Sequence, residues 1–182
     1  MLDTLRDIKK ELRAAMNGIA SAQMRQAGMP YRVIFGVELP RLQAIAQEFT
    51  PSRQLAQTLW NESVRESKLL ACMLMPREEF VPEVADIWIG EATAAECIQY
   101  LAFQLLRHEP WAAEWSFRWI ASSSENHQLA GMLTLSALLR DGIELNDFSR
   151  LELINQAESL LPTASLPLRK AINNLTTALD VN

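Results

Sequence analysis

Four basic side chains in the first half of the sequence have the types and spacing of a phosphate-binding surface. Two belong to an extended stretch and the helix start after it, Arg32 and Arg41, and two lie one turn apart on a later helix, Arg65 and Lys68. Cationic side chains neutralise phosphates, and a helix start beside Arg41 could also hold one. The alternative is a solvated basic face whose charges pair with Glu38, Glu62 and Glu66. The sequence leaves both interpretations open.

A row of tryptophans is the second pattern that could do chemistry. Trp111, Trp115 and Trp119 follow each other at steps of four residues, so they share one face of a helix. Indole rings stack on nucleic-acid bases for roughly 1 to 3 kcal/mol each, and the row could form such a platform. The adjacent acids Glu109 and Glu114 would repel phosphates. They favour the alternative, in which the row packs between neighbouring helices.

Motifs for metal binding and nucleophilic catalysis are missing from the sequence. Cys72 and Cys97 lie singly in apolar stretches, and with His108 and His127 they form no zinc spacing. The six glycines are isolated, so there is no Gly-rich phosphate loop, and no Gly-x-Ser-x-Gly turn occurs. We therefore expect neither a metal nor a cofactor.

The distribution of charge restricts where a nucleic acid could bind. The chain has 182 residues, of which 49% are hydrophobic and 21% charged, as in ordinary globular domains. Residues 1–77 contain 11 Lys or Arg against 7 acids, a balance of +4, whereas residues 78–182 contain 6 against 15, a balance of −9. A polyanion should therefore contact the N-terminal half.

The sequence also argues against a membrane-spanning protein. The uncharged apolar runs are far shorter than a membrane-spanning helix needs, and the first residues mix charges into what would be a secretory signal. We expect no membrane partner and a cytoplasmic location.

The elements that must position these side chains are helices, because apolar residues recur at steps of three and four almost throughout. Prolines begin new apolar periods and separate the helices. The spacing predicts an extended connection at 29–36 and helices at 2–26, 40–49, 52–61, 63–75, 79–89, 93–108, 110–121, 125–140, 146–161 and 165–179. Short turns between so many helices favour stacked antiparallel pairs, and a globular helical bundle is the alternative.

One stretch resembles a known family. It contains a Gly-Val-x-x-Pro-x-Leu turn at 36–42, a Leu-Ala-x-x-Leu-Trp helix at 55–60, and an acidic residue before a Leu-Leu-Ala run at 66–71. This stretch is similar to bacterial DNA alkylation repair glycosylases built of HEAT-like helical repeats. The resemblance implies an all-α fold, an α-α superhelix of HEAT- or armadillo-like repeats with a concave face, in a single domain over residues 1–182.

The resemblance also allows the repair site to be located. Enzymes of this family excise alkylated purines with an Asp that stabilises positive charge on the sugar, an Arg on a later helix and a late Trp. Matching outward from Arg107-His108 and from the Trp-Ile-Ala-Ser stretch at 119–122 places these three positions at Ala94, Leu129 and Asn174. The chain departs from the family at all three.

Glu91 and Glu96 are the carboxylates left near the site of the missing Asp. One of them could act electrostatically in its place. The alternative is that both are helix-start acids, which the helix macrodipole favours.

The sequence therefore predicts a diverged, non-catalytic member of the DNA alkylation repair family that binds nucleic acid or protein. Two alternatives stay open. One is an active DNA glycosylase that uses Glu91 or Glu96 as a substitute carboxylate. The other is a purely protein-binding scaffold, which the acidic C-terminal half suggests.

Overall fold

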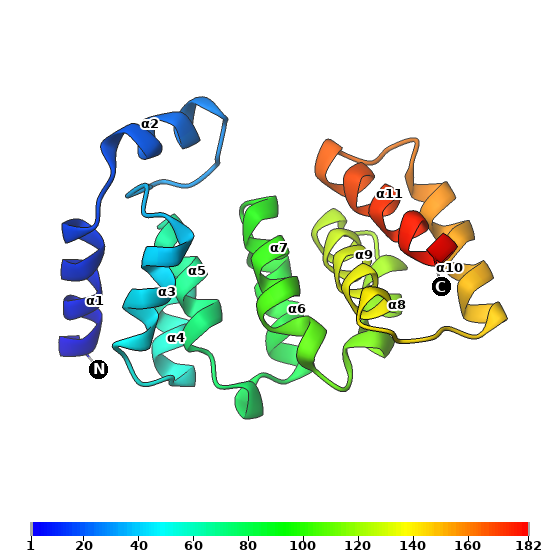
Figure 1. Cartoon of the computed structure of the whole chain (residues 1–182), viewed down its shortest axis with the longest axis horizontal. Coiled ribbons are helices and arrows are strands. Elements are labelled where there is room, and N and C mark those ends of the chain that lie inside the picture. The colour runs from blue at the N-terminus through cyan, green and yellow to red at the C-terminus, as the bar shows by residue number, and fades with distance from the viewer. Residues whose placement is uncertain (1, 182) are drawn as a thin grey trace. The chain divides into compact units, whose positions relative to one another are not determined.

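Helices make up nearly all the regular structure of the chain (Figure 1). The computed structural model describes the backbone of residues 2–181 and the side chains of residues 3–179. The α-helices are α1 (Leu2–Ala14), α2 (Gly18–Gln26), α3 (Leu39–Gln47), α4 (Arg53–Trp60), α5 (Arg65–Leu74), α6 (Pro82–Glu91), α7 (Ala95–Gln104), α8 (Ala112–Ile120), α9 (Glu125–Arg140), α10 (Asp147–Leu160) and α11 (Leu166–Val181). Two 3-10 turns, η1 (Arg77–Glu79) and η2 (Leu106–His108), join some of them. Within the described residues the strand-like pairing is one parallel bridge between Val33 and Val64, so the predicted all-α class is confirmed.

Residue contacts divide the chain into two compact units, Met1–Val81 (unit 1) and Pro82–Asn182 (unit 2). The single domain expected over residues 1–182 stays a prediction. Its end residues, Met1 and Asn182, lie outside the described part.

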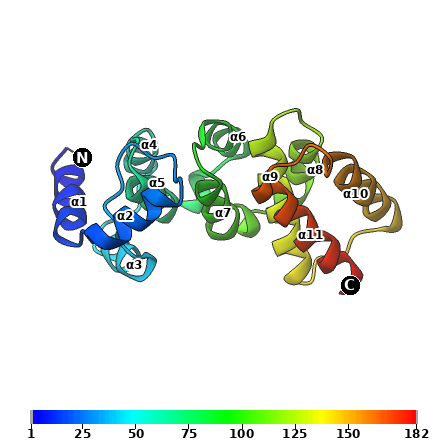
Figure 2. The ribbon, with the colours of Figure 1, turned by 90° about the horizontal axis from the view of Figure 1, so that it is seen from above.

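Unit 1 is built around α5, which packs against α3 and α4. The core of unit 1 is formed by buried apolar side chains from every helix of the unit except α2. Among them are Ile8, Leu12, Leu42, Ile45, Leu59, Trp60, Leu69 and Leu70. Seen from above, α2 lies across the ends of α3 and α5 (Figure 2).

Unit 2 is organised by α9, whose residues from Leu129 to Leu139 are all buried. This helix packs against α6, α7, α8 and α11. Contact with α8 is close because of Gly131: a Cβ there would lie 2.6 Å from the carbonyl oxygen of Ser116. In Figure 2, α6, α8 and α10 lie along one side of unit 2, and α7, α9 and α11 along the other.

The predicted first helix, 2–26, is in fact two helices, and this is the largest error of the sequence-based assignment. Asn17 interrupts it with extended backbone (φ −119°, ψ 102°) and caps α2 by accepting a hydrogen bond from the amide of Ala20. The amide of Asn17 donates instead to Phe35 O (3.0 Å). The apolar spacing continues across this break, so the sequence pattern does not show that a helix ends there. The end is set by the Asn17 cap and by the bond to the distant Phe35 carbonyl.

Two other predicted helices have different ends. The one expected at 79–89 begins at Pro82, after the turn η1, and the one expected at 93–108 stops at Gln104, before the turn η2. Tight 3-10 turns have nearly the same apolar spacing as a last helical turn, which explains both differences.

Gly36 is required by both its backbone conformation and its surroundings. Its φ is +76°, a region that side chains disfavour. An added Cβ would also lie 2.3 Å from Asn17 O and 2.5 Å from Ser21 N, which are backbone atoms at the start of α2. Gly36 is therefore where α2 and the extended connection touch.

We predict that Gly36→Ala lowers the free energy of unfolding by about 3 kcal/mol or more, because it adds a backbone clash to the cost of positive φ. Gly28→Ala is the matched control, since Gly28 has φ +80° but nothing within 4 Å of an added Cβ. The control should lose only about 1 kcal/mol. Urea unfolding followed by circular dichroism measures both, and equal losses would contradict the close approach at Gly36.

Candidate nucleic-acid interface

A buried carboxylate holds the extended connection of unit 1 in place. Glu66, in the first turn of α5, has no exposed surface and accepts hydrogen bonds from three consecutive backbone amides. Phe35 N donates to Oε2 at 3.0 Å, while Gly36 N and Val37 N donate to Oε1 at 2.9 and 3.2 Å. Bonds to an ionised acceptor are stronger than neutral ones, which compensates for burying the charge.

The opposite edge of the same connection is bonded to α2. Ser21 Oγ donates to Ile34 O at 2.7 Å, and Arg25 Nη2 donates to the same oxygen at 3.3 Å. The bridge between Val33 and Val64 adds two backbone bonds of 3.1 Å each: Val33 N donates to Ser63 O, and Arg65 N donates to Val33 O. Residues 33–37 are thus fixed from both sides by α2 and by the start of α5.

Two of the four predicted phosphate contacts, Arg65 and Lys68, turn out to be buried, with 5% and 6% of their surface exposed. Arg65 Nη1 donates to Val37 O (3.1 Å) and lies 3.2 Å from Glu66 Oε1. Lys68 Nζ donates to Trp60 O (2.6 Å) and lies 4.6 Å from the centre of the Trp60 ring. Both cations face protein groups, so their burial opposes direct contact with a phosphate.

The other two, Arg32 and Arg41, are exposed. Arg41 pairs with Glu11 at 3.3 Å, and both side chains remain partly in solvent. Such surface pairs contribute little and can exchange for a phosphate. No ion pair of Arg32 is found among the side chains of residues 3–179.

The start of α3 beside Arg41 offers fewer free amides than expected. Pro40 has no N–H, and Arg41 N already donates to Glu38 O at 3.1 Å. A phosphate here would be bound by the Arg41 side chain and not by the helix end.

Residues 8–177 match the family model described as DNA alkylation repair enzyme. The chain belongs to this family. The resemblance carried by the stretch from Gly36 to Ala71 is therefore confirmed over nearly the whole length.

The solved structure of another protein supports the repeat fold of this DNA alkylation repair family member. That protein is described as one of "a new family of proteins related to the HEAT-like repeat DNA glycosylases with affinity for branched DNA structures". The two chains share 18% identity with a TM-score of 0.84 over 96% of this chain and 74% of the other. At this identity the similarity establishes the fold, and the predicted HEAT-like helical repeats are confirmed. A search of curated proteins gives no match.

The three positions matched to the family's repair site lie in unit 2 and carry no charge. Ala94 is the half-buried residue that precedes α7, Leu129 is 4% exposed on α9, and Asn174 is exposed on α11. Of the substitute carboxylates, Glu96 lies in the first turn of α7, as expected for a helix-start acid. Glu91 is instead the exposed last residue of α6, so the macrodipole does not favour it.

The tryptophan row forms a packed cluster on α8 and its N-cap residue, Trp111. Ring centres lie 6.0 to 6.5 Å apart, with two edge-to-face pairs and one tilted pair. Trp119 is 2% exposed, and the Arg118 guanidinium lies 5.1 Å from the centre of the Trp115 ring. These contacts agree with the packing interpretation, most clearly for Trp119.

Sequence reasoning missed a carboxylate that ties three helices of unit 2 together. Asp86 Oδ1 on α6 accepts a bond from Trp119 Nε1 (2.9 Å) and lies 3.2 Å from His127 Nε2 on α9. The other ring nitrogen of His127 is 2.8 Å from Ser124 Oγ. These residues are 33 and 41 positions apart from Asp86, and no short motif connects them.

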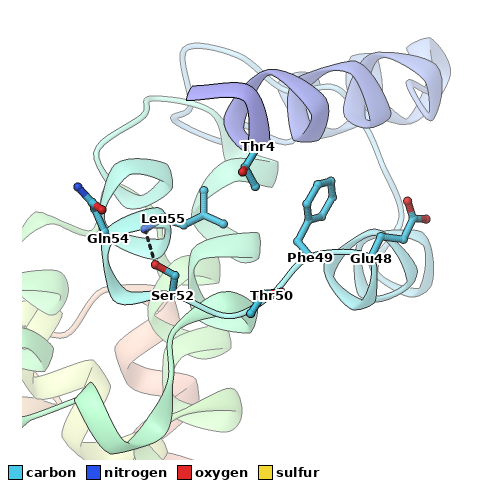
Figure 3. A pocket seen from close by; sticks show the side chains of 7 residues that line it. All are labelled: Thr4, Glu48, Phe49, Thr50, Ser52, Gln54 and Leu55. Atoms are coloured by element: carbon cyan, nitrogen blue, oxygen red, sulfur yellow. Dashed lines mark hydrogen bonds between the residues drawn. The ribbon is translucent and has the colours of Figure 1, made fainter. Parts of the chain in front are cut away.

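A hollow of unit 1 is lined by residues of α1, the segment after α3 and the start of α4 (Figure 3). Its volume is about 370 Å³, and it is lined by Thr4, Glu48, Phe49, Thr50, Ser52, Gln54 and Leu55, without a cation. Among the described residues no cluster of His, Cys, Asp and Glu could hold a metal, and no helix is long and apolar enough to cross a membrane.

We predict that Glu66→Gln lowers the free energy of unfolding by about 3 kcal/mol. The amide keeps one acceptor oxygen but turns an NH2 group toward at least one backbone N–H, which then loses its acceptor, and the remaining bonds lose the charge of the carboxylate. Glu38→Gln is the control, since Glu38 is exposed and makes no side-chain cap bond. It should change stability by less than about 0.5 kcal/mol. Urea unfolding measures both variants, and a similar small effect for each would show that the Glu66 bonds contribute little.

Proposed function

We propose that this protein binds DNA through unit 1 and does not excise bases. The observation that carries the proposal is the position of Arg32, which is exposed next to a connection fixed by the buried Glu66 carboxylate. Because the backbone beside Arg32 is already ordered, binding a phosphate there costs side-chain freedom but no ordering of the main chain. Arg41, at the start of the next helix, supplies a second exposed cation.

The charge distribution and the structurally similar protein both favour DNA over a purely protein partner. The positive balance of residues 1–77 matches a polyanion, whereas the acidic remainder of the chain would be repelled by one. The structurally similar protein is described as having affinity for branched DNA, which supports the same ligand class here.

We propose that the protein does not excise bases, because base excision leaves positive charge on the sugar that a fixed anion must stabilise. Ala94, Leu129 and Asn174 supply no charged group at the matched positions. Glu96 is the better placed substitute, since it is half-buried next to Ala94, and an active glycosylase that uses it is the second candidate.

We predict that Arg32→Ala and Arg41→Ala each weaken binding to duplex DNA by roughly three- to tenfold at low salt. Each should also reduce the slope of log K against log salt by about 0.9, because one phosphate contact is lost. Fluorescence anisotropy with a labelled duplex at several salt concentrations measures both quantities.

Arg118→Ala is the matched control for net charge, because Arg118 is an exposed arginine of unit 2 paired with Glu114. It should leave affinity and slope unchanged. Loss of affinity in this variant but not in Arg32→Ala would place the DNA on unit 2 and contradict the proposal. A wild-type protein that binds no DNA at low salt would favour the protein-binding scaffold.

We predict that N-methylated duplex DNA incubated with the protein releases base no faster than it does in buffer. Chromatography of the released base measures the rate. Faster release that is lost in Glu96→Gln and kept in Glu91→Gln would contradict the non-catalytic proposal and identify the substitute carboxylate.

A further inference from the structure

Helix α2 and the residues just before it expose apolar side chains. Ile19 is 76% exposed, and Met16, just before the helix, is 60% exposed. Gln23 and Gln26 follow Ile19 at steps of four and three, so they lie on the same outward face, and both are exposed. This face combines an apolar tip with neutral amides.

The chain segment that carries this face contains no acidic residue. Residues 12–37 contain Arg13, Arg25 and Arg32 and no Asp or Glu. All three arginines are exposed. A chain segment of this length without an acid, in a protein whose net charge is −5, has the charge that complements a phosphate backbone.

The inner face of α2 is anchored. Ser21 is 6% exposed and bonds to Ile34 O, and the backbone of Asn17 and Ser21 packs against Gly36. Figure 1 shows α2 lying across one end of unit 1, reached by the connection from α1 and left by the loop to α3. Ile19 therefore projects from a short helix bonded to residues 34–35, in the connection that the Glu66 carboxylate fixes.

We propose that α2 is a wedge that reads branched DNA. The side chains of Ile19 and Met16 enter the unstacked base step at a branch point, while Arg13, Arg25 and Arg32 contact the phosphates around it. Apolar wedges flanked by basic and amide side chains are a general device for opening a base step, and the cost of unstacking is lowest where the stack is already interrupted. The inference rests on the proposed DNA binding and adds the structure that is recognised.

A protein partner fits this face less well. Helices that dock in protein grooves present apolar anchors at several successive turns. On the outward face of α2, Ile19 is the one large apolar side chain, and the next two positions are glutamines. Amides next to an apolar tip suit the edges of bases.

The test compares a three-way DNA junction with a duplex of the same length, using the full chain. A 2-aminopurine at the branch point reports stacking of the neighbouring base. The variant is Ile19→Ser, and the matched control is Phe148→Ser, because Phe148 on α10 has the same exposed fraction of 76% but lies in the acidic unit 2. Both side chains are in solvent, so equal urea unfolding curves verify that each variant is folded.

We expect the wild-type protein to prefer the junction over the duplex by about tenfold and to change the 2-aminopurine fluorescence. Ile19→Ser should lose most of that preference and the fluorescence change while its affinity for duplex stays within about twofold. Phe148→Ser should behave as wild type.

Two results would overturn the wedge and leave DNA binding intact: equal wild-type affinity for junction and duplex, or an unchanged junction preference in Ile19→Ser. A wild-type protein that binds neither DNA at low salt would overturn the wedge and the proposed function together.

Discussion

The structure of unit 1 depends on the buried carboxylate of Glu66. An ionised side chain without contact with water is costly unless its oxygens are bonded, and here three consecutive backbone amides and one guanidinium satisfy them. The bonds fix the connection between α2 and α3. Position 36 in this connection requires glycine, because a residue with a side chain would be strained by the positive φ and would clash with the backbone of Asn17 and Ser21.

The basic residues near Glu66 fall into two groups, those buried inside unit 1 and those exposed to solvent. Arg65 and Lys68 direct their charges to a carboxylate and to carbonyl oxygens inside unit 1. Arg32 lies beside the clamped backbone but points to solvent, and α2 rests on the same backbone. The same internal bonds hold a segment, residues 12–37, that contains exposed arginines and exposed apolar side chains but no acidic residue.

The sequence was sufficient for the helical class, for most helix ends and for the family, because these follow from local periodicity, proline positions and the turn at Gly36. It was insufficient for the break at Asn17, for the burial of Arg65 and Lys68, and for the tie between Asp86, Trp119 and His127. Each of these depends on a partner between 8 and 41 residues away. A lysine in solvent and a lysine bonded to a buried carbonyl have the same local pattern. The pairing of Glu66 with backbone amides was missed for the same reason, since sequence suggests side-chain partners for an acid and not main-chain ones.

Hydrogen–deuterium exchange of the protein with and without a DNA junction tests most directly whether unit 1 is the DNA-binding part. We expect slower exchange in peptides that cover residues 13–41 and no change in peptides of α8, α9 and α10. Protection confined to unit 2 would contradict it.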